Sequence, residues 1–84
     1  MKPYRVRVEV SLKPGHSDPE GDATAEALRD LGYPVEGAKV SKVYTLMVKA
    51  YSREDAERLA EEVSRRLLAN PTKDTYMVRV EEMG

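Results

Sequence analysis

Residues 38–51 constrain the fold of this chain most, because these fourteen consecutive residues contain no Gly, Pro, Asn or Asp. Their side chains alternate between two faces, as in a β-strand. At about 3.3 Å per residue an unbroken strand would span about 46 Å, whereas a compact chain of this length has a diameter of about 30 Å. The strand must therefore bend near Ser41 and Lys42, or one end must project and pair with a neighbouring chain.

Two further strands flank this segment in the sequence. Apolar and polar side chains alternate strictly over residues 4–12, which predicts a half-buried strand that ends before Pro14 and Gly15. A shorter alternation of the same kind predicts a last strand over residues 76–81.

Two helices separate the strands. Asp18 is expected to cap the first one, with Pro19 at its first position and Gly32 as its left-handed end. Ser52 is expected to cap the second helix, whose apolar stripe includes Leu67 and which stops before residues 70–71.

The predicted order is therefore strand, helix, long strand, helix, strand, in one α+β domain over residues 1–84. The simplest arrangement is an antiparallel sheet covered on one face by both helices, a relative of the ferredoxin-like split βαβ fold. On this arrangement Val43, Met47 and Met77 lie on the second face of the sheet. Apolar residues on that face, the small size and the long strand together predict that the chain associates into an oligomer, with Val43, Met47 and Met77 at the contact.

Composition excludes several functions. The chain has no Cys and a single His, which excludes a thiol nucleophile, a disulfide and a multi-histidine zinc site. Its net charge of −1 argues against binding of duplex nucleic acid. The longest apolar run is too short for a membrane span, so we expect a cytoplasmic protein.

Residues 13–21 form the most suggestive loop, because they are longer than a strand-to-helix connection requires. This loop could hold an anion at the helix start, or it could be a plain surface turn. His16 beside Asp18 could belong to an acid–base or metal cluster, although an exposed loop histidine is favoured. Gly21 is unfavourable inside a first helical turn, which indicates close approach by another backbone or a partner.

The same segments resemble the PurS family. The resemblance is carried by Asp18-Pro19-Glu20-Gly21, by Lys42 in the long strand, and by the run Leu67-Leu68-Ala69-Asn70-Pro71 that closes the second helix. It extends in order and spacing over nearly the whole chain. Where the family usually has glycine before the lysine, this chain has Ser41, so a bend there would carry more strain.

The resemblance implies a function. PurS is the small, non-catalytic subunit of phosphoribosylformylglycinamidine (FGAM) synthase, which acts in de novo purine biosynthesis. It would form a homodimer, or a tetramer, that bridges a PurQ-type glutaminase and a PurL-type synthetase and supports ammonia transfer between them. On this reading the chain binds no cofactor, and ATP and magnesium belong to the synthetase.

Eight residues are candidates for contact with these partners, because family signatures and unfavourable local choices coincide there: Lys13, His16, Asp18, Pro19, Gly21, Lys42, Asn70 and Pro71. An alternative is a regulatory domain of the ACT type that senses a small molecule. Its hairpin is hard to place in residues 38–51, which lack a turn residue. An RNA-binding sheet and an acylphosphatase-like enzyme fit less well, because the chain lacks exposed-face Phe or Trp and a clear phosphate cradle.

Overall fold

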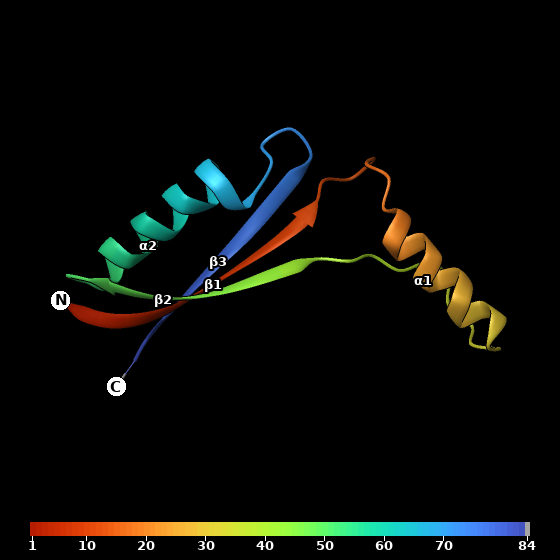
Figure 1. Cartoon of the computed structure of the whole chain (residues 1–84), viewed down its shortest axis with the longest axis horizontal. Coiled ribbons are helices and arrows are strands. Elements are labelled where there is room, and N and C mark those ends of the chain that lie inside the picture. The colour runs from red at the N-terminus through yellow and green to blue at the C-terminus, as the bar shows by residue number, and fades with distance from the viewer. Residues whose placement is uncertain (84) are drawn as a thin grey trace.

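The structure, a computed structural model that describes residues 1–83, confirms the predicted order of strands and helices. Its elements are β1 (Lys2–Leu12), α1 (Pro19–Asp30), β2 (Lys42–Ala50), α2 (Arg53–Val63), the π-helical turn η1 (Ser64–Leu68) and β3 (Asp74–Glu82). The strands form one antiparallel sheet in the order β2-β1-β3 (Figure 1). None of the described helices has the length and apolar character to cross a membrane.

The core lies between this sheet and α2. Tyr4, Val6, Val8 and Val10 of β1 are buried, because β1 is the central strand and these residues face the helix. Cross-strand neighbours extend the apolar surface to both sides. Val6, for example, stands opposite Leu46 of β2 and Val80 of β3. Strict alternation in β1 therefore places a continuous apolar surface on one face of the sheet.

Small residues allow α2 to approach this surface closely. Ala56 and Ala60 are fully buried beneath the helix, and the hydroxyl of Ser52 accepts a hydrogen bond of 3.1 Å from the amide of Asp55, as a capping residue does. Tyr76 of β3 adds a bond from its hydroxyl to the Glu61 carboxylate at 2.7 Å. This bond to a carboxylate raises the pKa of Tyr76.

The second helix ends differently from the prediction. Residues 64–68 form a π-helical turn, in which the hydroxyl of buried Ser64 donates to the Ala60 carbonyl at 2.7 Å. The wider turn rotates the following residues around the axis. As a result Leu68 packs against the core, while the expected core residue Leu67 is 82% exposed.

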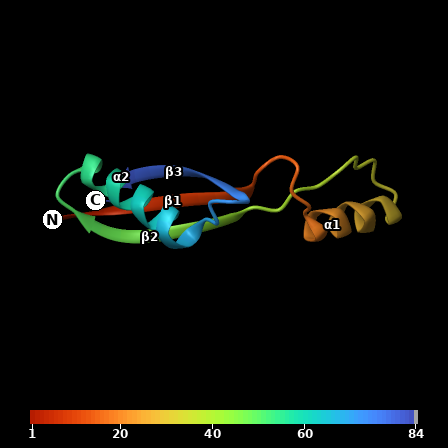
Figure 2. The ribbon, with the colours of Figure 1, turned by 90° about the horizontal axis from the view of Figure 1, so that it is seen from above.

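The position of α1 is the main correction to the predicted fold. Only α2 covers the sheet within residues 1–83, and α1 lies beyond the end of the sheet in both views (Figures 1 and 2). The chain therefore measures 51 × 30 × 13 Å, with a radius of gyration of 16.4 Å. A compact chain of this length would have a radius of gyration of about 12 Å.

The sequence of residues 38–51 explains why α1 lies away from the sheet. β2 has nine residues, not fourteen, and it begins at Lys42. Residues 33–41 precede it outside any helix or strand. After a tight turn in which the Val35 amide donates to the Tyr33 carbonyl at 2.9 Å, they run back beside α1 as an extended segment that continues into β2 (Figure 2). Because residues 38–51 contain no turn residue, nothing reverses the chain onto its own sheet. We name residues 18–40, which comprise α1 and this extended segment, the arm.

The π-helical turn makes a testable prediction about stability. Leu68→Ala should lower the free energy of unfolding by about 1–2 kcal/mol, less than the cost at a fully buried leucine because Leu68 is half-buried. The matched variant Leu67→Ala should change it by less than about 0.5 kcal/mol. Chemical denaturation followed by circular dichroism measures both. Equal losses in the two variants would contradict the π-helical register.

Candidate functional site

The predicted partner-contact residues come together at the end of the sheet nearest the arm. β1 ends and β2 and β3 begin at this end, so Lys13, Lys42 and residues 70–71 lie near one another although the sequence separates them widely. The ammonium group of Lys13 donates to the Pro71 carbonyl at 2.8 Å, and its amide donates to the Lys73 carbonyl at 2.7 Å. We name this region the loop end; it comprises residues 11–21, 38–42 and 70–74.

Asp18 connects the two halves of the arm. One carboxylate oxygen accepts from the Gly21 amide at 2.8 Å, which is the predicted N-cap, and the other accepts from the Val40 amide at 2.9 Å. Sequence reasoning found the first contact but missed the second, which joins residues 22 positions apart. Hydrogen bonds from Gly21 and then Val40, aided by nearby Lys39, lower the pKa of Asp18.

A glycine is required at position 21 because another backbone segment approaches closely there. The sequence predicted this approach, since glycine is unfavourable in the first turn of a helix. It is buried, and a Cβ atom there would lie 2.3 Å from the carbonyl oxygen of Ala38. Further along α1, the Arg29 guanidinium donates to the carbonyls of Val35 and Glu36 at 3.1 and 3.4 Å. The helix and the extended segment thus form one unit.

Asn70 organises the turn between η1 and β3. Its side-chain oxygen accepts from the Thr72 amide at 2.9 Å, and its carbonyl accepts from the Lys73 and Asp74 amides. The Asp74 carboxylate accepts in turn from the Asn70 amide at 2.8 Å. Side chains of Asn and Asp commonly close turns in this way, so Asn70 has a folding role apart from any partner.

A cleft of about 250 Å³ lies between the arm and the end of β1. Lys13, His16, Asp18, Lys39 and Ser41 contribute to its lining. The Ser41 hydroxyl lies 2.8 Å from that of Ser11, which keeps the start of β2 beside β1. His16 is exposed, and both oxygens of Asp18 accept backbone amides. Within residues 1–83, no group of three or more His, Asp or Glu side chains is placed to hold a metal.

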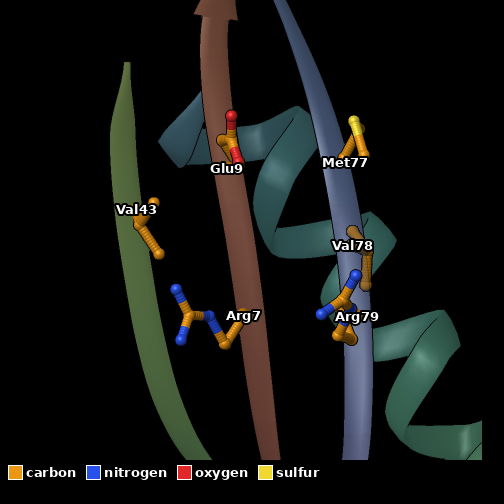
Figure 3. Close-up of a pocket in the computed structure, with 6 residues that line it drawn as sticks. All are labelled: Arg7, Glu9, Val43, Met77, Val78 and Arg79. Carbon is orange, nitrogen blue, oxygen red and sulfur yellow. The ribbon is translucent and has the colours of Figure 1, made fainter. Parts of the chain in front are cut away.

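The predicted dimer-contact residues occupy the sheet face turned away from α2, which we name the open face. Val43 and Met77 stand on either side of Glu9 and share a shallow depression of about 310 Å³ with Arg7 (Figure 3). Met47 lies further along β2 on the same face, opposite Arg5. All three predicted residues are exposed, the two methionines for more than half of their surface.

Charged residues on the open face were missed in the sequence, because strand pairing is needed to bring them together. Arg7 and Arg79 are directly opposite on neighbouring strands, and like charges in this position repel. Among the described residues the ion pairs on this face include Arg5 with Glu81 at 3.8 Å, but none involves Arg7 or Arg79. The open face therefore suits a partner that carries carboxylates and apolar groups.

Comparison with known proteins identifies the family. The family model described as "PurS: Phosphoribosylformylglycinamidine (FGAM) synthase" matches residues 5–82. A phosphoribosylformylglycinamidine synthase subunit PurS from Archaeoglobus fulgidus is 44% identical over 84% of this chain and 90% of its own. The chain belongs to the PurS family.

Solved PurS structures share the whole fold. PurS from Thermus thermophilus superposes with a TM-score of 0.88 at 35% identity, covering 98% of this chain and 99% of its own. A chain in the structure of PurLQS from Thermotoga maritima superposes with a TM-score of 0.87 at 28% identity, covering 99% and 100%. These alignments include the arm, so the PurS fold places it in the same way.

Family membership settles the general function. As a member of the PurS family, the chain is a subunit of phosphoribosylformylglycinamidine synthase, an enzyme of purine biosynthesis. The alternative of an ACT-type sensing domain finds no support in these comparisons.

The double contact of Asp18 predicts a pH-dependent arm. The pKa of Asp18 is lower in the folded arm than the usual value near 3.9. Its stabilising effect is therefore complete above about pH 4 and is lost as the pH falls through the lower, folded pKa. NMR titration of the Gly21 and Val40 amides should show both signals moving together below about pH 4. Asp18→Asn should abolish this transition, and titration of either amide only above pH 4 would contradict the double contact.

Proposed function

We propose that this chain is the non-catalytic small subunit that bridges the glutaminase and the ATP-dependent synthetase of its FGAM synthase. The observation that carries the proposal is the close match, over nearly the whole length of both chains, to a chain in the PurLQS structure from T. maritima. In this role the subunit supports transfer of ammonia from glutaminase to synthetase. ATP and magnesium are bound by the synthetase.

The composition of the chain agrees with a bridging role. Release of ammonia from glutamine by a thiol nucleophile requires a cysteine, and this chain has none. That step must therefore take place on another polypeptide. Ammonia then has to reach a second active site without loss to solvent, which requires that the two sites be held in a fixed relative position.

The shape of the chain provides separate contact surfaces. The loop end presents the exposed side chains of Lys13, His16 and Lys42. The open face presents Arg7 and Arg79 together with the exposed apolar side chains of Val43, Met47 and Met77. A body 51 Å long and 13 Å thick exposes both surfaces at once. Another copy of the chain can thus occupy the open face while the loop end stays free for the catalytic subunits.

Self-association belongs to the same proposal. We propose that the chain works in the cytoplasm as a homodimer, which can pair further into a tetramer, and that Val43, Met47 and Met77 contact another copy. This contact is supported by the exposure of these three large apolar side chains on one face of the sheet. Scattered exposed apolar residues are common, but a cluster on one face is typical of a protein contact.

Reconstitution with the cognate glutaminase and synthetase tests the bridging role. Omission of this chain should lower glutamine-dependent FGAM formation at least tenfold, because ammonia escapes when the two sites are not held together. Activity with added ammonium salt should change less than twofold, since the synthetase then needs no glutaminase. Equal glutamine-dependent activity with and without the chain would overturn the proposal.

A pair of charge reversals on β2 tests the loop end. Lys42→Glu should weaken binding to the synthetase–glutaminase pair by about tenfold, the effect of about 1.4 kcal/mol. Lys49→Glu changes the same charge at the other end of the strand and should have little effect. Analytical ultracentrifugation of each variant alone verifies that self-association is intact. Equal affinity of Lys42→Glu and the natural chain would exclude Lys42 from the contact.

A further inference from the structure

The outer edge of β3 is regular and unpaired. β3 lies at one side of the sheet order β2-β1-β3, and its nine residues pair with β1 in one continuous register. The strand contains no proline, no lysine and no bulge, three features by which natural edge strands avoid pairing with other chains. Within residues 1–83 no further strand pairs with this edge.

Two hydrogen bonds show which backbone groups of β3 point outward. At one end of the β1–β3 pair the Lys13 amide donates to the Lys73 carbonyl at 2.7 Å, and at the other end the Met83 amide donates to the Pro3 carbonyl at 3.1 Å. Because bonded residues alternate along an antiparallel pair, the odd-numbered residues of β3 bond to β1. The amides and carbonyls of residues 76 and 78 therefore point away from the sheet, where a further strand can reach them.

The helix α2 turns this edge into a groove. Figure 3 shows α2 passing behind the sheet and emerging beyond the outer side of β3. A groove of about 560 Å³ is lined there by Val78 and Val80 of β3 and by charged residues of α2. When a peptide adds to the edge of a sheet, main-chain hydrogen bonds supply affinity and pockets for alternate side chains supply specificity. The edge of β3 offers both.

The charges along the groove are complementary to a strand with two different faces. On the open face, Arg79 and the opposite Arg7 form no ion pair among the described residues. On the groove side, the arginines of α2 are paired with carboxylates of the same helix, which leaves Glu54 without an ion-pair partner in residues 1–83. A strand with a carboxylate on its open-face side and a cation on its groove side therefore fits this edge, and its carboxylate offsets the repulsion between the two arginines.

The carboxylates of β3 are already engaged, which argues for another protein as the occupant. Each of the three has a partner in the same chain: Glu81 with Arg5, Glu82 with Lys2, and Asp74 with the Asn70 amide. A second β3 placed along the edge has no free carboxylate to offer Arg79. The groove therefore suits a segment of a different protein better than it suits a second copy of this chain.

We propose that an extended segment of another subunit of the synthase binds along this edge as a fourth strand. The segment bonds to the outward amides and carbonyls of Tyr76 and Val78. A carboxylate on one of its faces lies against Arg79, while apolar side chains and a cation on its other face enter the groove beside Val80 and Glu54. This inference rests on the proposed bridging role and assigns one contact of that role to a surface separate from the loop end.

A proline at position 78 tests the main-chain contact. The Val78 amide points outward, so Val78→Pro removes one donor to the added strand while the bonds between β1 and β3 remain, and proline is tolerated at such edge positions. Affinity for the synthetase–glutaminase pair should fall at least tenfold. Val78→Ala keeps the amide and should lower the affinity less than threefold. Equal losses in the two variants, with both folded by circular dichroism, would overturn main-chain pairing.

Charge reversal at Arg79 separates a binding role from a structural one. Arg79→Glu removes the cation that faces the added carboxylate, and it places an acidic residue opposite Arg7, which stabilises a strand pair. The variant should therefore bind the synthetase–glutaminase pair at least tenfold more weakly, and yet resist denaturant better when it is free. Unchanged affinity would overturn the proposed placement of the strand.

Hydrogen exchange at single amides identifies the occupied edge in the natural chain, and so decides the question even where Val78→Pro does not fold. In the free chain the amides of Met77 and Arg79, which bond to β1, should exchange slowly, and those of Tyr76 and Val78 should exchange fast. In the complex with the cognate glutaminase and synthetase, the Tyr76 and Val78 amides should slow at least tenfold.

The outcomes of this measurement are distinct. A complex that forms without protection of the Tyr76 and Val78 amides would overturn strand addition and leave the bridging role in place. Absence of any complex would overturn both. Protection that appears in the free chain and increases with its concentration would show a second copy at the edge, and would overturn the proposed occupant.

Discussion

One carboxylate determines the shape of this molecule. The two oxygens of Asp18 hold the start of α1 and the entrance to β2 together, in a part of the chain where the sheet offers no support within the described residues. Gly21 allows the two segments to touch, because any side chain at this position would collide with the Ala38 carbonyl. The arm therefore keeps a fixed direction even though it lies outside the core. Without this contact α1 would be a short helix on two flexible connections, and twelve residues alone form a marginal helix in water.

The position of the arm has a consequence for stability. The core of a single copy consists of one helix over three strands, with small residues such as Ala56 and Ala60 at its centre. Chains of this size commonly need additional support from metal ions, disulfides or association, and this one has no cysteine. Association supplies that support through mass action, because a partner that binds only the ordered arm stabilises the folded state. Self-association of the kind proposed above would therefore couple the stability of the fold to the concentration of the chain.

The sequence predicts local structure well because local structure here follows from local rules. Asp18 as N-cap, the close approach at Gly21 and the alternation of β1 were all deduced from neighbouring residues, and the structure confirms them. The sequence also indicated that residues 38–51 are too long for the monomer, but it did not choose between a bend and a projecting end. The default arrangement of two helices on one face was therefore wrong for the single chain. The choice between them depends on whether the backbone can reverse at Ser41. The alternation of side chains along the strand does not show this.

The candidate-site residues show a similar division between what the sequence indicated and what it missed. Lys13, Lys42 and residues 70–71 were singled out in the sequence as candidates for partner contact, and the antiparallel sheet explains why such distant residues lie together. The second contact of Asp18, with the Val40 amide, and the opposed Arg7 and Arg79 were missed, because each requires a pairing of segments that spacing along the chain does not reveal. The exposed Leu67 was missed for a different reason. A single π-helical turn shifts the helical period by one residue, and a pattern read at regular spacing assigns the wrong leucine to the core.

The loop end and the arm share residues 18–21 and 38–40, and this overlap links binding at the loop end to the direction of the arm. Lys39, Val40 and Ser41 line the cleft of the loop end, and they also form the passage from arm to sheet. A partner that binds at the loop end therefore contacts the segment whose direction decides where the arm points. By linkage, a partner that binds one direction of the arm more tightly must shift the arm toward that direction, and an arm held in that direction must bind the partner more tightly by the same factor. The geometry of a few residues around Ser41 can in this way couple the direction of the arm to the binding of another subunit at the loop end.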